Sequence, residues 1–185
     1  MIEIVPYRQS WPAEFAAIAA ELREAAGKDI LAIHHIGSTS VPGLAAKDII
    51  DVQVTVADIA IAESLPFDDS HFVRHLKMRD HCPPGLALAD KQLEKCFYRG
   101  ARRAANIHAR VAGRFNQRYP LLCRDYLRAR PAAANAYAAI KVELARLFPN
   151  DSDSYYAIKD PVFDLMTAQA EDWAAQTAWS APPSD

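Results

Sequence analysis

A turn of small and hydroxyl-bearing residues, Gly37-Ser38-Thr39-Ser40, comes shortly before a single acidic residue, Asp51, in an otherwise aliphatic run. Glycine lets a ligand approach the backbone closely, and the N–H groups and hydroxyls of such a turn suit a phosphate, most naturally a triphosphate. A carboxylate inside an aliphatic run must be satisfied, and a divalent cation is one way to satisfy it. The pattern therefore predicts a site for a metal-bound polyphosphate.

Each of these features also has a purely structural alternative. The turn at 37–40 could be a tight connection with capping serines and no ligand. Asp51 could accept hydrogen bonds from this turn, or pair with Lys47 or an arginine. A Walker A loop fits poorly, because Leu44 stands where its lysine would follow the second glycine. The G-x-S-x-G pattern of a serine-hydrolase elbow is absent from the sequence.

Histidines and arginines supply further candidates. His35, beside the turn, could bind phosphate or carry a proton, and a structural hydrogen-bonding role is the alternative. His108 could join Asp51 in a one-metal or hydrolytic site. Arg124 and Arg128 lie one helical turn apart, so they share a face that could grip a triphosphate or belong to a salt-bridge network with neighbouring acids.

Apolar periodicity predicts the elements that position these side chains. Spacings of three and four predict a helix over 11–26, ended by a glycine. Alternation predicts a strand over 48–56, and shorter runs predict strands at 30–36, 96–99 and 106–111. Residues 57–95 show no clear period beyond a short helix at 57–64. The alternation places two sets of side chains on polar strand faces: Asp51 with Gln53, and Asn106 with His108 and Arg110.

From residue 115 onward the period changes to about 3.6, which predicts helices that begin near 115, near Pro131 and at the capping residues 151–154. No repeat or linker divides the chain. We therefore expect one α/β (α+β) domain over 1–178, with a mixed sheet and a helical C-terminal half packed against it, and a frayed tail over 179–185. If the helical half folds over the sheet, three of its residues border the same cleft: Lys141, Tyr155 and Lys159.

The composition is typical of a globular protein. With 185 residues, 51% of them hydrophobic and 24% charged, the chain can bury one substantial core. A net charge of −2 argues against a nucleic-acid partner. The sequence has neither a membrane-spanning apolar run nor a signal peptide, so we expect no membrane partner and a cytoplasmic location. Cys82, Cys96 and Cys123 lack C-x-x-C spacing, so we expect neither disulfides nor a zinc cage.

One long string and several short ones carry a resemblance to a known family. They are His35-Ile-Gly-Ser-Thr-Ser-Val-Pro-Gly-Leu-Ala-Ala-Lys47, Ile49-Ile-Asp-Val52, Ile107-His108, Arg124-Asp-Tyr-Leu-Arg128, and the separate residues Pro131, Tyr137, Lys141, Asp151, Tyr155 and Lys159. Together they resemble the GrpB family over nearly the whole chain. That family is placed in the nucleotidyltransferase superfamily and is found fused to dephospho-CoA kinase in some bacteria. The resemblance implies a nucleotidyltransferase-like mixed sheet with flanking helices.

The superfamily pattern also implies a chemistry. Its Gly-Ser turn holds nucleotide phosphates, and carboxylates at i and i+2 of one strand hold two Mg²⁺ ions for in-line attack on the α-phosphorus. The ligands we expect are thus a nucleoside triphosphate and Mg²⁺ or Mn²⁺. The candidate phosphate contacts are Gly37, Ser38, Thr39, Ser40, Lys47, Arg124 and Arg128; the candidate metal ligands are Asp51, Gln53 and His108, of which Asp51 and His108 are also the candidate catalytic residues.

Two positions depart from that pattern. Residue 53 is a glutamine, which brings no negative charge, and His108 stands where a third carboxylate is expected. A single protein carboxylate would bind two Mg²⁺ ions poorly. Three hypotheses follow: nucleotidyl transfer to a small-molecule acceptor, a non-catalytic nucleotide-binding or accessory module, and a metal-dependent hydrolase that uses Asp51 and His108.

Overall fold

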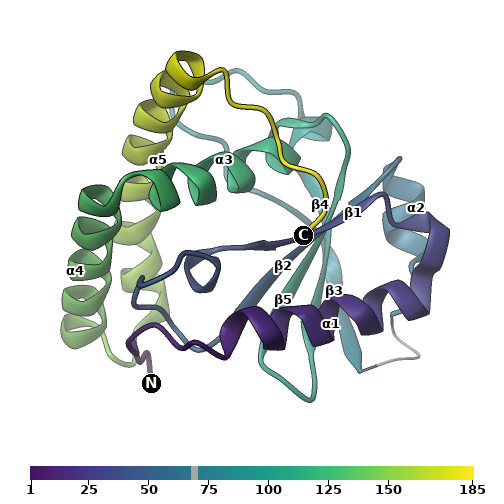
Figure 1. Ribbon diagram of the computed structural model, residues 1–185, viewed down its shortest axis with the longest axis horizontal. Helices are drawn as coiled ribbons and strands as arrows, with labels where there is room; N and C mark the ends of the chain where they lie inside the picture. Colours follow the sequence, from purple (N-terminus) through teal and green to yellow (C-terminus); the bar gives the residue numbers. More distant parts are fainter. Residues whose placement is uncertain (68–70) are drawn as a thin grey trace.

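The computed structural model describes residues 1–67 and 71–185, which fold around one mixed sheet (Figure 1). The described strands form a five-stranded sheet in the order β1-β2-β5-β4-β3. β2 and β5 run parallel, and the other neighbouring pairs run antiparallel. The mixed sheet confirms the fold class expected from the sequence. The strands are β1 (Ala32–Ile36), β2 (Ile50–Val56), β3 (Phe72–Arg79), β4 (Glu94–Gly100) and β5 (Ala105–Val111).

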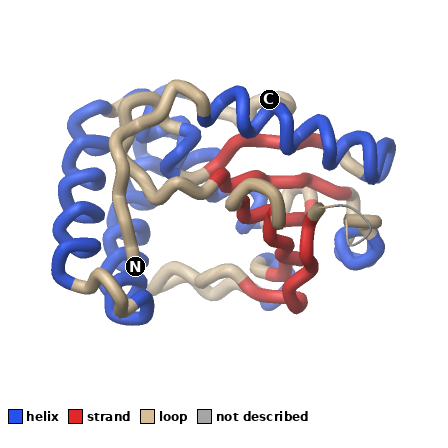
Figure 2. The backbone as a smooth tube through the Cα atoms, turned by 90° about the horizontal axis from the view of Figure 1, so that it is seen from below, coloured by secondary structure: helices blue, strands red, loops and turns tan. Residues whose placement is uncertain are grey.

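Helices lie on both sides of this sheet. The N-terminal helix and a short second helix cover one face, and the three C-terminal helices stand on the other side (Figures 1 and 2). This arrangement confirms the helical C-terminal half expected from the sequence. The helices are α1 (Trp11–Ala26), α2 (Ile59–Ser64), α3 (Phe115–Ala129), α4 (Pro131–Leu147) and α5 (Ser152–Thr177), with single 3₁₀ turns at Gly27–Asp29, Ser38–Ser40 and Asp90–Gln92.

Alternation along β2 divides the sheet into an apolar and a polar face. Val52 and Val54 are fully buried in a core cluster that includes Trp11 and Leu22 of α1. Burying each such side chain contributes about 1.5–3 kcal/mol. Asp51 projects from the opposite face, which α3, α4 and α5 overlie. The packing of α1 therefore determines that the polar face points towards the C-terminal helices.

Capping and packing position the C-terminal helices. Pro131 occupies the start of α4, where a missing N–H costs no hydrogen bond. Asp151 caps α5, because its Oδ1 accepts a hydrogen bond from the N–H of Ser154 at 3.0 Å. A second core cluster then joins these helices to the segment after the Gly37 turn. It includes Val41, Leu44, Leu127, Tyr137 and Met166.

The strand β3 lies in the range where the sequence shows no clear period. It is an edge strand that pairs only with β4 among the described strands. The pairing with β4 shifts register between His75 and Met78. Val73 and Met78 are 56% and 43% exposed, so burial does not impose an apolar pattern here.

The segment 179–185, expected from the sequence to be frayed, instead runs from the end of α5 past α3, where Trp179 Nε1 donates to Asp125, and its last residues, 182–185, bond to the outer edge of β1 (Figure 1). The Asp185 N–H donates to the Ile33 carbonyl at 3.0 Å, and the Ile33 N–H donates to Ser184 Oγ at 2.9 Å. His34 Nε2 lies 3.0 Å from the carbonyl oxygen of Pro183. An edge strand leaves backbone groups without partners, and this segment supplies them.

Candidate functional site

A cavity of about 450 Å³ lies between the polar face of the sheet and the helices α3 to α5. Its volume is in the range of about 300–1,000 Å³ that is usual for small-molecule sites. The Gly37 turn, β2 and β5 form one wall, and α4 and α5 contribute lysines and tyrosines to the other. Because the helical half does pack over the sheet, Lys141, Tyr155 and Lys159 line one cavity, as expected from the sequence.

Gly37 and Asp51 are in direct contact at the base of the cavity. Gly37 has φ +70° and ψ −172°, a conformation that is essentially restricted to glycine. A Cβ built on it would lie 2.3 Å from Asp51 Oδ2. Asp51 Oδ1 accepts a hydrogen bond from Asn106 Nδ2 at 2.8 Å. Burial alone would raise the pKa of Asp51, but the nearby His108 ring and the hydrogen bond from Asn106 outweigh it and lower the pKa. Asp51 is therefore an ionised carboxylate held against the turn.

Gln53 is bound by the protein on both sides of its amide. Its Oε1 accepts from Arg110 Nη1 at 2.8 Å, and its Nε2 donates to the carbonyl of Gln117 at 2.9 Å. The residue is fully buried and does not line the cavity. The Gln53 amide is therefore held by Arg110 and Gln117 away from the cavity.

His108 lines the cavity between Asp51 and Lys95. Its Nε2 is 3.9 Å from Asp51 Oδ1, and its Nδ1 is 3.1 Å from Lys95 Nζ. Burial, together with the charges of Arg110 and Lys95, lowers the pKa of His108 to about 4. The ring is therefore neutral near pH 7.

These contacts test whether the residues fit the two metal ions that the resemblance implies. Among the described residues, no group of three or more His, Cys, Asp and Glu side chains could hold a metal ion. Of the three expected ligands, Asp51 is the one that places an anionic oxygen in the cavity, next to the Gly37 turn. Mg²⁺ often keeps several waters and binds through one carboxylate plus substrate phosphates. The site fits one such shared ion and does not fit a pair.

Lysines line the wall opposite Asp51. Lys141 is 2% exposed, and its Nζ donates to Ser38 Oγ at 2.8 Å and to the carbonyl of Ala45 at 2.6 Å. Within the described part of the chain, no carboxylate forms an ion pair with Lys141. Burial, and secondarily the charge of Lys159, lowers the pKa of Lys141 to about 7. A buried ammonium without an anion is costly, so this group has an unmet need for one.

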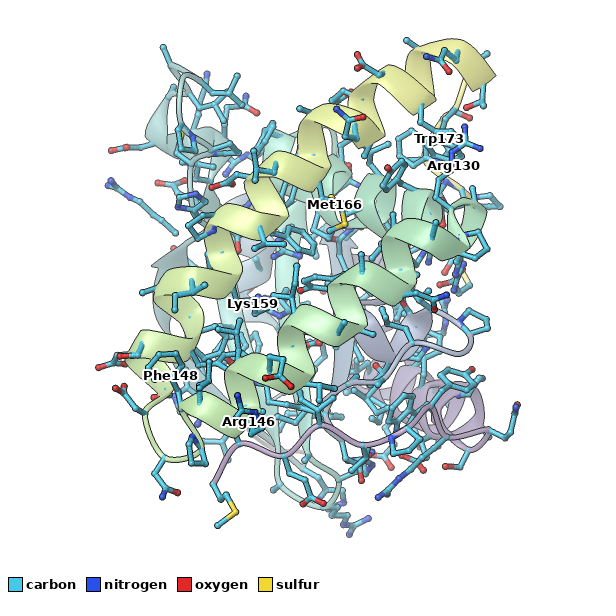
Figure 3. The ribbon with its side chains drawn as sticks, turned by 90° about the vertical axis from the view of Figure 1, so that its left-hand side faces the viewer. Arg130, Arg146, Phe148, Lys159, Met166 and Trp173 are labelled. Carbon is cyan, nitrogen blue, oxygen red and sulfur yellow. The ribbon has the colours of Figure 1, made fainter. Side chains whose placement is uncertain are left out.

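Two further lysines complete this wall. Lys47 donates to the Tyr156 hydroxyl and lies 4.4 Å from the centre of that ring. Lys159 of α5 lies between α4 and α5 in Figure 3, and its Nζ is 3.2 Å from Asp160. Both lysines line the cavity.

The arginines expected to grip a triphosphate bind the protein instead. Arg124 is 3% exposed and donates to the His35 carbonyl at 3.0 Å, to Asp125 and to Asp185. Arg128 donates twice to the Ser40 carbonyl, at 2.8 and 3.0 Å. The two side chains thus bind the backbone just before and at the end of the Gly37–Ser40 turn. Their guanidinium donors are engaged by backbone carbonyls and acids, which is close to the salt-bridge alternative that the sequence left open.

Of the turn hydroxyls, some face the cavity and others bind the protein. Ser38 Oγ faces Lys141, as described above. Thr39 lines the cavity, but its Oγ1 lies 3.0 Å from His35 Nε2. Ser40 Oγ donates to the Gly37 carbonyl at 2.6 Å. His35 itself is stacked on Phe15 at 4.7 Å between ring centres, and burial lowers its pKa to about 4. The structural role for His35 is the one the geometry supports.

Asp80, to which the sequence pattern gives no role, binds side chains from β4, β5 and α3 beside the cavity. Its carboxylate accepts from Arg110 Nε at 2.8 Å, from Asn116 Nδ2 at 3.0 Å and from Lys95. Arg110 and Lys95 lower the pKa of Asp80 well below its usual range, although burial alone would raise it. Asp80 follows β3, in the range without a readable period, so no sequence signal identified it.

Comparisons with known proteins agree with this architecture. The GrpB protein family model matches residues 1–169. A dephospho-CoA kinase of Mycolicibacterium paratuberculosis is 33% identical over 96% of this chain and 48% of its own length. The UPF0157 protein YqkA of Bacillus subtilis is also 33% identical, over 93% of this chain and 48% of its own length. The chain therefore spans about half the length of these curated relatives.

A solved structure gives the same result at the level of the fold. The crystal structure of the conserved protein GrpB from Enterococcus faecalis is 28% identical, with a TM-score of 0.75 over 92% of this chain and 99% of that one. A bilayer-crossing helix is absent from the described part of the chain, since none is both long and apolar enough. The family model, the relatives and the solved structure agree over nearly the whole sequence, and the chain belongs to the GrpB family.

Proposed function

We propose that the cavity binds a nucleoside triphosphate together with one divalent cation, and that the protein transfers its nucleotidyl group to a small-molecule hydroxyl or amine. The observation that carries this proposal is Lys141, a buried amine that donates to the neutral oxygens of Ser38 and Ala45 and whose protonated form a bound phosphate would favour. Lys47 and Lys159 line the same cavity. A polyphosphate would supply the negative charge that this wall lacks.

Aromatic side chains support a ligand with a base as well as phosphates. Tyr137, Tyr155, Tyr156 and Phe163 line the cavity on the side of α4 and α5. Such rings offer stacking surfaces of the kind that bind nucleobases without reading their identity. Cationic and aromatic side chains share this wall, since Lys47 Nζ lies 4.4 Å from the ring centre of Tyr156 and Lys159 Nζ lies 5.6 Å from that of Phe163, so the wall offers contacts for both parts of a nucleotide.

Asp51 is the group we assign to the divalent cation, shared with the phosphates. In the transfer step the acceptor oxygen or nitrogen forms a bond to the α-phosphorus, the bond to pyrophosphate breaks, and the acceptor proton passes to solvent. The cation would offset the charge of the phosphates during this displacement. The chain's own contribution is to position the phosphates against Ser38 and Lys141.

Calorimetric titration of the purified chain with each common nucleoside triphosphate and Mg²⁺ tests this proposal. We expect Lys141→Met to weaken binding at least tenfold, because it removes the cation at the turn. Lys28→Met is the matched control, since Lys28 is exposed in the Gly27–Asp29 turn and lies outside the cavity. If no triphosphate binds the wild-type chain, or both variants bind equally well, the proposal is wrong.

The second candidate is a nucleotide-binding module without catalysis. It is favoured by residue 53, a glutamine held by Arg110 and Gln117, which brings no second carboxylate beside Asp51. The hydrolase alternative would use Asp51 with His108. Product analysis separates the three: pyrophosphate with a nucleotidylated acceptor supports transfer, release of phosphate in water supports hydrolysis, and binding with no product supports the module.

A further inference from the structure

His108 contacts a lysine through one ring nitrogen and faces the carboxylate of Asp51 with the other. Lys95 Nζ is 3.1 Å from Nδ1. A lysine ammonium has three donors and no acceptor, so Nδ1 must accept, and the proton of the neutral ring must be on Nε2. The protonated nitrogen is the one that lies 3.9 Å from Asp51 Oδ1.

Asp80 holds Lys95 in this position, and its carboxylate opposes burial and the charge of Arg110, which together lower the pKa of Lys95. The Lys95 side chain is 9% exposed, and it donates to Asp80 Oδ1. The same carboxylate accepts from Arg110 and from Asn116, so it is fixed by three groups from β4, β5 and α3. A carboxylate so placed favours the ammonium form of Lys95, and the lysine cannot rotate away without losing this ion pair.

This arrangement is the reverse of a metal-binding histidine. A histidine that ligates a metal donates the N–H of its other nitrogen to a carboxylate or carbonyl, which leaves a lone pair for the metal. Here the other nitrogen meets a donor, so the nitrogen that faces the cavity carries the proton. His108 Nε2 therefore has no lone pair to give, and the positive charge of Lys95 lies behind the ring.

We infer that Lys95 fixes His108 as an Nε2–H hydrogen-bond donor, so that His108 and Lys95 stand in place of a second metal ion instead of binding one. The 3.9 Å between Nε2 and Asp51 Oδ1 is too long for a direct hydrogen bond, so the N–H is free to reach a phosphate oxygen bound beside Asp51. That last role rests on the proposed function. The position of the proton does not, because it is a property of the ligand-free protein.

Nitrogen-15 NMR of the ligand-free chain, with labelled histidine, tests the position of the proton directly. We expect the His108 Nε2 resonance in the range of a protonated ring nitrogen and Nδ1 in the range of an unprotonated one. Lys95→Met should shift the ring towards the opposite tautomer, and Lys95→Arg, which restores a donor, should reverse that shift. Asp80 keeps Arg110 and Asn116 in both variants, so the site retains partners for its carboxylate. A wild-type ring with its proton on Nδ1 would overturn the inference.

Metal and nucleotide titrations test the consequence. For Mn²⁺ alone, we expect Asp51→Asn to abolish binding and His108→Leu to leave the affinity within twofold of wild type. A tenfold loss in His108→Leu would show a histidine–metal bond and overturn the inference. For ATP with Mg²⁺, His108→Leu should weaken binding about tenfold, and His108→Gln, which keeps an N–H at similar reach, should lose less than threefold. Equal loss in both variants would overturn the donor role. If wild type binds no nucleotide while the NMR result holds, the proposed function fails and the position of the proton stands.

Discussion

Replacing Gly37 with alanine would place a methyl group where Asp51 now lies. The added Cβ would be 2.3 Å from Asp51 Oδ2 and 2.9 Å from Asp51 Cγ, so the carboxylate would have to move. Gly37 also has φ +70° with extended ψ, which is costly for any residue with a side chain. The substitution thus combines backbone strain with displacement of the one acidic side chain at the turn.

The two effects have separable magnitudes. Backbone strain in this region costs about 1–3 kcal/mol. Moving Asp51 disrupts its hydrogen bond from Asn106, and hydrogen bonds to charged groups contribute about 1.5–3 kcal/mol. We expect a total loss of about 2.5–6 kcal/mol, which corresponds to a fall in Tm of about 5–24 °C for a chain of this size. Nucleotide affinity should fall at least tenfold, because Asp51 no longer faces the phosphates.

Gly43→Ala is the matched control. Gly43 belongs to the same connecting segment and has φ +80°, but a Cβ built on it meets no atom within 4 Å. It should cost about 1–2 kcal/mol from backbone strain alone and leave nucleotide affinity unchanged. Urea unfolding and calorimetric titration of both variants measure the two effects. Equal affinity in Gly37→Ala and wild type would refute the argument that this glycine exists to admit the carboxylate of Asp51.

Two further predictions concern pH. The folded pKa of Lys141, about 7, lies below its unfolded value near 10.4, so the unfolded chain binds more protons in this window and wild-type stability gains with rising pH, on the order of 4 kcal/mol by about pH 10. Lys141→Met should lack this gain. Urea unfolding of both proteins at about pH 6 and about pH 10 gives the free energy of unfolding of each, and the change in their difference isolates Lys141 from other groups. An equal difference at the two pH values would contradict the prediction. Asp80 has a folded pKa far below its unfolded value near 3.9, so its contribution is present above about pH 4 and lost as pH falls. Asp80→Asn should cost about 3–5 kcal/mol at neutral pH and flatten the acid limb of the stability curve, and an unchanged acid limb would show that Asp80 is not the group responsible.

The parts of the fold that sequence predicts well are those in which burial imposes a period. The alternation of β2 puts Val52 and Val54 in the core and leaves Asp51 on the polar face. The glycine at the end of β1 is also readable, because its conformation excludes other residues. Both features can be read from the residue types at a few consecutive positions, whichever partners they meet in the fold.

The parts that sequence does not predict depend on partners far away in the chain. The Ser184 and Asp185 side chains bond to β1 at a separation of about 150 residues. Asp80 owes its place to Arg110 and Lys95, which a register between β4 and β5 brings together. Arg124 and Arg128 are correctly expected to share one side of a helix, but spacing does not tell whether that side meets a ligand or the carbonyls of His35 and Ser40.

The glutamine at position 53 and the arginine at position 110 are one feature of this site. Gln53 Oε1 lies 2.8 Å from Arg110 Nη1, and Arg110 also bonds Asp80. A carboxylate introduced at position 53 would therefore meet a guanidinium before it met a metal ion, and the two would form a buried ion pair. Its negative charge would be neutralised by the protein. A second metal ion thus requires a change at Arg110 as well as at Gln53. While both residues are present, the positive charge on this side of the cavity comes from Arg110 and Lys95, and the N–H of His108 adds a hydrogen-bond donor.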